Sequence, residues 1–260
     1  MSAVIDTDLN SGTPSPSLSP SRRVWQRFRK DRRGYISLLI FSVLFVVSLF
    51  AEFISNDRPL LVRYNGQWMV PIAHDYSERV FGGDFESPAD YLDPFIRQQL
   101  SKDGNWAIYP INHYRHDTLN YFAKSPNPAP PSLDNWLGTD DRGRDVLARL
   151  LYGFRISILF GLALTITGIV LGVITGAVQG YFAGRTDLLF QRFMEIWGSM
   201  PELYLLIIFA SIFDPSILLL LLLLSLFGWM GLSDYVRADF LRNRNLDYVQ
   251  AARALGLSNA

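Results

Sequence analysis

Cysteine is absent from this 260-residue sequence, and lysine and histidine are scarce. Without cysteine the chain can form no disulfide and can offer no thiolate to a metal or a substrate. Lysine occurs only at Lys30, Lys102 and Lys124, so nearly all basic residues are arginine. The formal net charge is zero. This argues against nucleic acid as the main partner, because phosphate binding requires an excess of cations.

Sequence motifs for catalysis are also missing. No glycine is followed by lysine, so there is no phosphate-binding loop of the Walker type, and no Gly-x-Ser-x-Gly elbow occurs. His113 and His116 lie three residues apart beside Asp117, a spacing that could begin a metal site, but no glutamate stands at metalloprotease spacing. We therefore expect no catalytic, cofactor-binding or metal-binding residue.

Long apolar runs dominate what the sequence does contain. The first begins at Gly34 and stays uncharged to Ala51, and with Glu52 at the far interface it supplies about 20 helical residues, enough to cross a hydrocarbon core of roughly 30 Å. It is too long for a typical signal-peptide core, so an uncleaved anchor is expected. The predicted fold class is an all-α polytopic membrane protein. Its four expected spans are residues 34–55, 153–181, 188–213 and 215–233.

The N-terminal region divides into a tail and a basic segment. Residues 1–20 are rich in Ser, Pro and Thr and are expected to be disordered. Residues 21–33 carry seven basic residues interrupted by Val24, Trp25 and Phe28 at helical spacing, which predicts an amphipathic helix in the membrane interface. A nucleic-acid arm is the other interpretation of such a run. Adjacent arginines place the N-terminus in the cytoplasm by the positive-inside rule.

Residues 56–152 contain no span and are charged, aromatic and rich in turns. Because the first span runs outward, this segment is expected to be periplasmic. Its end, residues 144–154, sets Val146, Leu147, Leu150 and Leu151 on one helical face, which predicts a separate helix lying on the membrane before the second crossing.

Two features of the later spans favour close packing and a bend. Small residues on one face let helices approach to backbone contact inside a membrane, which predicts a packing face in the second span. In the third span Pro201 predicts a kink. Glu202 beside it is expected either to line a transport pathway or to sit with Glu195 at headgroup depth, where the two would pair with Arg192. The packing glycines recur every fourth residue: Gly168, Gly172, Gly176 and Gly180.

After the fourth span, residues 234–260 are expected in the cytoplasm. They include a short helical stretch with small residues on its surface, which suits contact with another protein. We call residues 246–256 the coupling segment. Its candidate contact residues are Asp247, Gln250, Ala251, Ala252, Arg253 and Gly256.

Several segments together resemble one family. The stretch WLGTDDRGRDVL at 136–147 resembles the LGTD-x-x-GRD signature of dipeptide and oligopeptide ABC importer permeases. Residues 155–157, 180–187 and 248–256 are similar to the same family, and FGGDF at 81–85 resembles its microcin C subgroup. The signature residues are Gly138, Thr139, Asp140, Gly143, Arg144 and Asp145.

This resemblance implies an ABC importer permease fold in the bacterial inner membrane, with a large extracytoplasmic insertion. The implied partners are a second permease subunit, ATPase subunits that bind ATP and Mg²⁺, a periplasmic peptide-binding protein, a peptide substrate such as microcin C, and membrane lipid. The coupling segment would contact the ATPase. Two departures stand out: Gln250 occupies the position of the usual glutamate, and the family's last two spans are missing from these residues, which suggests a truncated product.

Two other functions fit a membrane protein with a large outer segment. One is a channel or ligand-binding membrane protein without an ATPase, and the other is a membrane-anchored enzyme that uses residues 56–152. Co-purification of an ATPase separates the permease from the channel, and passage of intact peptides excludes the enzyme.

Overall fold

The computed structural model describes residues 19–102, 104–119, 121 and 126–256, so the expected disordered tail lies almost wholly outside the described residues. The chain divides into two compact units, residues 1–148 and 149–260, and each is described by itself. The expected class, an all-α polytopic membrane protein, is confirmed in that the protein is mostly helical with several candidate membrane spans, although it also contains a small sheet.

The first unit begins with an amphipathic helix and a membrane-length helix. Helix α1 (Pro20–Lys30) carries the basic residues, and its Trp25 and Phe28 rings stack with centroids 5.7 Å apart. The side chain of Asp31 then accepts a hydrogen bond from the Gly34 backbone N–H and caps α2 (Arg32–Leu49). Almost all of α2 is exposed within the chain, which suits a lipid-facing helix. The short α3 (Ala51–Ile54) follows.

A small sheet, which sequence reasoning did not anticipate, organises the segment between the first two candidate spans. Strands β1 (Leu61–Tyr64), β2 (Gln67–Met69) and β3 (Trp106–Ile108) form an antiparallel sheet in the order β2-β1-β3. The 3-10 helix η1 (Glu78–Phe81) and helix α4 (Pro94–Leu100) pack on one face of it. The buried core residues are Val62, Met69, Phe81, Tyr91, Ile96 and Leu100.

Helix α5 (Val146–Phe182) is a single element of 37 residues. The prediction of a separate surface helix over 144–154 is wrong, because nothing interrupts the helix between Val146 and the apolar run. Residues 146–154 contain neither glycine pairs nor proline to end a helix, and the face of leucines simply continues into the span. At 1.5 Å per residue a helix of this length is about 55 Å long, so it extends beyond a hydrocarbon core.

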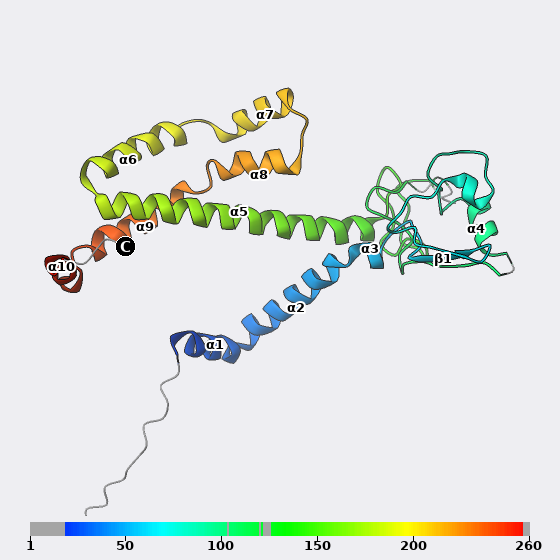
Figure 1. Cartoon of the computed structure of the whole chain (residues 1–260), viewed down its shortest axis with the longest axis horizontal. Helices are drawn as coiled ribbons and strands as arrows, with labels where there is room; N and C mark the ends of the chain where they lie inside the picture. Colours follow the sequence, from blue (N-terminus) through cyan, green and yellow to red (C-terminus); the bar gives the residue numbers. More distant parts are fainter. Residues whose placement is uncertain (1–18, 103, 120, 122–125, 257–260) are drawn as a thin grey trace, which may run out of the picture. The chain divides into compact units, whose positions relative to one another are not determined.

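The following helices form a bent pair (Figure 1). A single residue, Ala183, separates α5 from α6 (Gly184–Gly198), and both Ala183 and the first residue of α6, Gly184, take positive φ angles. Helix α7 (Glu202–Ile212) begins after Pro201 and is bent by 65° from α6. The break falls where proline removes a backbone donor.

Two further helices and the coupling segment complete the second unit. Helix α8 (Ile217–Ser225) is capped by the Ser216 side chain, and a turn over 226–229 separates it from α9 (Met230–Asn243). A short α10 (Asp247–Ala254) lies within the coupling segment (Figure 1). Among the described residues, the candidate membrane spans are Arg32–Leu49, Val146–Phe182, Ile217–Asn243 and the bent pair α6–α7.

Candidate functional site

The glycines of α5 face α9 at backbone distance. A Cβ atom on Gly176 would lie 2.5 Å from the Ser233 carbonyl oxygen, and one on Gly180 would lie 2.4 Å from the Phe240 Cβ. On Gly172 it would lie 2.9 Å from the Leu232 Cβ, whereas on Gly168 it would make an ordinary contact of 3.7 Å. Three of the four glycines therefore occupy positions with no room for a side chain, and α9 packs directly on the α5 backbone there.

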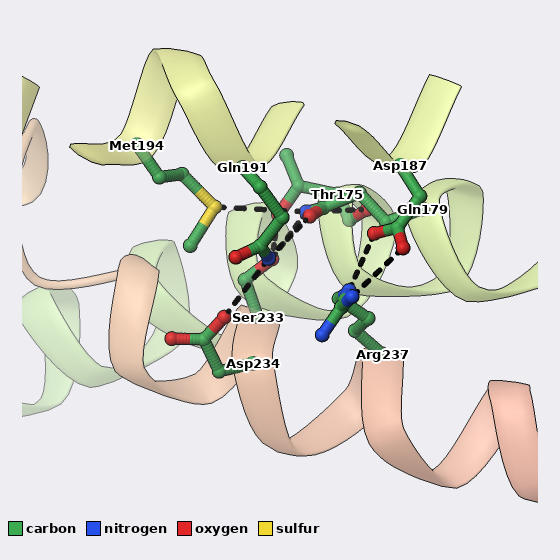
Figure 2. Close-up of polar contacts among 8 residues, drawn as sticks. All are labelled: Thr175, Gln179, Asp187, Gln191, Met194, Ser233, Asp234 and Arg237. Carbon is green, nitrogen blue, oxygen red and sulfur yellow. Dashed lines mark hydrogen bonds and ion pairs between the residues drawn. The ribbon is translucent and has the colours of Figure 1, made fainter. Parts of the chain in front are cut away.

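A polar cluster, buried at Gln179 and Ser233 and exposed at Asp234, joins α5, α6 and α9 beside these glycines. We define it as Thr175, Gln179, Gln191, Met194, Ser233 and Asp234 (Figure 2). Gln179 and Ser233 are fully buried, and the Gln179 Nε2 donates to the Ser233 Oγ over 2.9 Å. The Gln191 Nε2 donates to the Gln179 Oε1 over 3.1 Å and to the Asp234 Oδ1 over 3.3 Å. These bonds satisfy polar groups that would otherwise be costly in an apolar bundle.

Sequence reasoning did not identify this cluster. The available signal was weak: isolated polar residues such as Gln179 and Ser233 interrupt otherwise apolar helices, and polar side chains inside a membrane bundle usually face a partner. No sequence feature indicates that Gln179 and Ser233, 54 positions apart, are bonded to each other.

The coupling segment follows α9 after a three-residue turn. Helix α10 carries Asp247 in its first turn, where a negative charge is favourable. Ala251 is exposed, Ala252 is half-buried, and the Gln250 Nε2 donates to the Asn245 carbonyl over 3.3 Å. Gly256 takes a φ of +76°, a conformation that favours glycine just beyond a helix. The backbone places Arg253 within α10.

The segment around the Pro201 kink shows two separate features. Glu202 is the first residue of α7 and is half-buried, in the first turn where a carboxylate is favoured. Arg192 pairs with Glu195 at 2.5 Å on the exposed side of α6. A pathway role for Pro201 and Glu202 remains a prediction.

The family signature lies in the first unit and fixes its loops. Gly138 and Gly143 take φ angles of +76° and +81°, and a Cβ on Gly138 would lie 2.4 Å from the Ala129 carbonyl oxygen. The Thr139 Oγ1 donates to the Asn127 Oδ1 over 2.9 Å and accepts from the Ala129 backbone N–H over 2.8 Å. These residues tie the signature loop to the proline-rich stretch before it.

The Asp140 carboxylate accepts hydrogen bonds from other residues of the same loop. Burial opposes ionisation of its carboxyl group, but hydrogen bonds from the Arg144 backbone, the Arg144 guanidinium and the Arg142 backbone outweigh it and lower the pKa to about 2. Because the pKa is lowered in the folded state, ionised Asp140 stabilises the loop at pH values above the usual carboxyl pKa. This stabilisation disappears as the pH falls towards 2.

Asp145 joins the segment that precedes α5 to the start of that helix. Its buried carboxylate accepts hydrogen bonds from the Asn112 and Asn135 side-chain amides at 2.8 and 2.9 Å, and from the Ala148 backbone N–H at 2.7 Å. The last of these has the geometry of a helix cap. These hydrogen bonds give the aspartate at position 145 of the signature a structural role.

Replacing Asp145 with asparagine should loosen this segment. An amide at this position presents an N–H₂ group to donors, and one buried donor loses its acceptor, so the free energy of unfolding should fall by about 1–3 kcal/mol. Resistance of the segment between the first two candidate spans to added protease measures this loss. The exposed neighbour Asp141, changed to asparagine, is the control. Equal resistance in both variants would contradict the role given to Asp145.

Comparison with known proteins identifies relatives over nearly the whole chain. Residues 155–260 match the family described as the binding-protein-dependent transport system inner membrane component, and residues 19–78 match the N-terminal TM domain of oligopeptide transport permease C. The inner membrane ABC transporter permease protein YejE of Escherichia coli is 52% identical over 243 residues, 93% of this chain and 71% of that protein.

More distant relatives carry related descriptions. The peptidoglycan transport system permease protein YejE of Agrobacterium fabrum is 47% identical over 271 residues, covering 94% of this chain and 70% of that protein. The dipeptide transport system permease protein DppC of Bacillus subtilis is 27% identical over 241 residues, covering 93% of this chain and 57% of that protein. Of the segments that carried the resemblance, residues 155–157, 180–187 and 248–256 lie in the matched region 155–260, whereas the signature at 136–147 and FGGDF at 81–85 lie outside both family matches.

Proposed function

The chain belongs to the family of inner-membrane permease components of binding-protein-dependent ABC transporters, and from this premise we propose that it forms part of the translocation pathway of a peptide importer. Members of this family are transport subunits rather than enzymes. ATP and Mg²⁺ bind the partner ATPases in this proposal, and the chain itself holds no cofactor. The observation that carries the proposal is the coupling segment: a short helix that exposes Ala251 and Tyr248 and follows α9 within the family match.

The proposed partners follow from the family. A second permease subunit completes the pathway, ATPases bind the coupling segment from the cytoplasm, and a periplasmic binding protein delivers substrate. ATP binding would close the ATPases and rock the permease from an inward-facing to an outward-facing state, a rigid-body transition of the kind found in other transporters. The N-terminus lies in the cytoplasm in this arrangement, because the basic α1 precedes the first span.

Peptides are the proposed substrate class. The names of relatives refer to dipeptide, oligopeptide and peptidoglycan transport, and these substrates share peptide bonds. Microcin C is the narrower candidate that the FGGDF segment at 81–85 supports.

Reconstitution tests the proposal. The assembled transporter in proteoliposomes, given its binding protein and a mixture of tri- to hexapeptides, should hydrolyse ATP faster than it does without peptide. A peptidoglycan digest and microcin C, tested separately, determine which peptide-containing compounds stimulate hydrolysis. A complex that contains no ATPase, or one whose ATP hydrolysis ignores all three substrates, would contradict the proposed function.

A further inference from the structure

Arg237 and Asp187 form the one ion pair between different helices of the second unit that is evident within the described residues. The Arg237 Nε and Nη2 atoms both donate to the Asp187 carboxylate, the latter over 2.7 Å to Oδ2, so the pair is bidentate (Figure 2). Both side chains are largely shielded, with 28% and 16% of their surfaces exposed. Two-pronged pairs of this kind fix orientation as well as distance.

The backbone of Arg237 is held at the same point. A Cβ on Gly180 would lie 2.7 Å from the Arg237 carbonyl oxygen, so α9 rests on α5 at this residue. The side chain then reaches past α5 to Asp187, in the first turn of α6. Arg237 therefore contacts α5 through its backbone and α6 through its guanidinium.

The location of the pair along α9 suits a role in passing movement between helices. Helix α9 leads to α10 after only three residues, so a force applied to the coupling segment acts on the C-terminal half of α9, which includes Arg237. In the other direction, α6 leads to the 65° bend at 199–201 and then to α7. The pair therefore lies between the coupling segment on one side and the bent helices α6 and α7 on the other.

We propose that Asp187 and Arg237 are positioning residues that make α9 and α6 move together, so that displacement of the coupling segment reaches the α6–α7 bend. This proposal rests on the proposed importer function and deepens it. The glycine contacts hold α9 on α5, and the polar cluster adds the Gln191–Asp234 hydrogen bond between α6 and α9. Within the described residues, however, the bidentate pair is the only ion pair between α6 and α9. Without it, ATP hydrolysis should continue while transport falls.

The test compares uptake with ATP hydrolysis in the reconstituted transporter. Asp187→Asn removes the charge but keeps the shape, and uptake of a radiolabelled mixture of tri- to hexapeptides per ATP hydrolysed should fall by about tenfold, a typical size for coupling between sites. Arg237→Gln should act alike. Asp187→Glu, which keeps the charge, and the exchange of the two residues in Asp187→Arg with Arg237→Asp should restore much of the ratio.

Two controls separate this role from simple stability. Glu195→Gln breaks the exposed pair with Arg192 on the same helix and should leave the ratio unchanged. The amount of assembled transporter is measured for every variant. If Asp187→Asn lowers that amount but leaves the ratio of uptake to hydrolysis normal, the pair only stabilises the fold and the proposal is wrong. If the unmodified transporter shows no peptide-stimulated hydrolysis, the proposed function fails instead.

Discussion

Ala252→Glu in the coupling segment is expected to abolish peptide uptake while the permease still inserts and ATP hydrolysis continues. Helix α10 exposes the small Ala251, and Ala252 beside it is only half-buried within the chain, so this surface is available to an ATPase. A glutamate there adds bulk and a charge that docking would bury without a partner, which costs several kcal/mol. Uptake and ATP hydrolysis by the reconstituted transporter measure the effect.

The controls for this prediction keep the surface small. Ala252→Ser adds only a hydroxyl group and no charge, and its uptake should stay close to that of the unmodified transporter. Gly256→Trp should act like Ala252→Glu, because it places a large side chain at a position with a φ of +76°. Normal uptake by both Ala252→Glu and Gly256→Trp would show that the coupling segment is assigned wrongly.

Gly176→Leu should have the second large effect and prevent assembly of the folded permease. Even a Cβ atom at this position would lie 2.5 Å from the Ser233 carbonyl oxygen and 2.8 Å from the Val236 Cβ, so a leucine must push α9 off α5. That displacement also separates Gln179 from Ser233 and leaves buried polar groups unpaired. Overpacking alone costs about 1–3 kcal/mol, and the lost hydrogen bonds add to it.

The amount of detergent-stable permease in membranes measures this prediction. Gly161→Leu is the matched control, since the same helix leaves open space around that glycine. Gly168→Ala should also be tolerated, because its Cβ would make an ordinary contact of 3.7 Å. Equal yields of the Gly176 and Gly161 leucine variants would contradict the close packing of α5 and α9.

The sequence predicted the helical membrane class because uncharged runs of sufficient length have few alternatives in lipid. It also placed a kink at Pro201, where the structure breaks α6 from α7. Properties of a single segment determine these features. Proline lacks a backbone N–H to donate, and a run without charge needs no partner from elsewhere in the chain to be stable in lipid. The glycine spacing of α5 likewise indicated a packing face, although it did not indicate which helix would fill it.

Features that depend on distant pairing could not be predicted. The β1–β3 pairing joins residues more than 40 positions apart, across turns and loops that hide any alternation in such short strands. The Asp187–Arg237 pair joins residues 50 positions apart, and each residue alone looks like an ordinary charge near a membrane surface. The expected surface helix over 144–154 was wrong for a local reason. An amphipathic stretch and the fully apolar stretch after it can continue as one helix.

The central claim is that the coupling segment contacts the ATPase. Cross-linking tests this claim most directly. Because the chain contains no cysteine, Ala251→Cys introduces a single thiol on the exposed surface of α10. In the assembled transporter it should cross-link to the ATPase and resist a membrane-impermeant maleimide added outside intact cells, whereas a cysteine at the exposed Trp68 should react with that reagent. Labelling of residue 251 from outside, or the absence of any cross-link to the ATPase, would contradict the account.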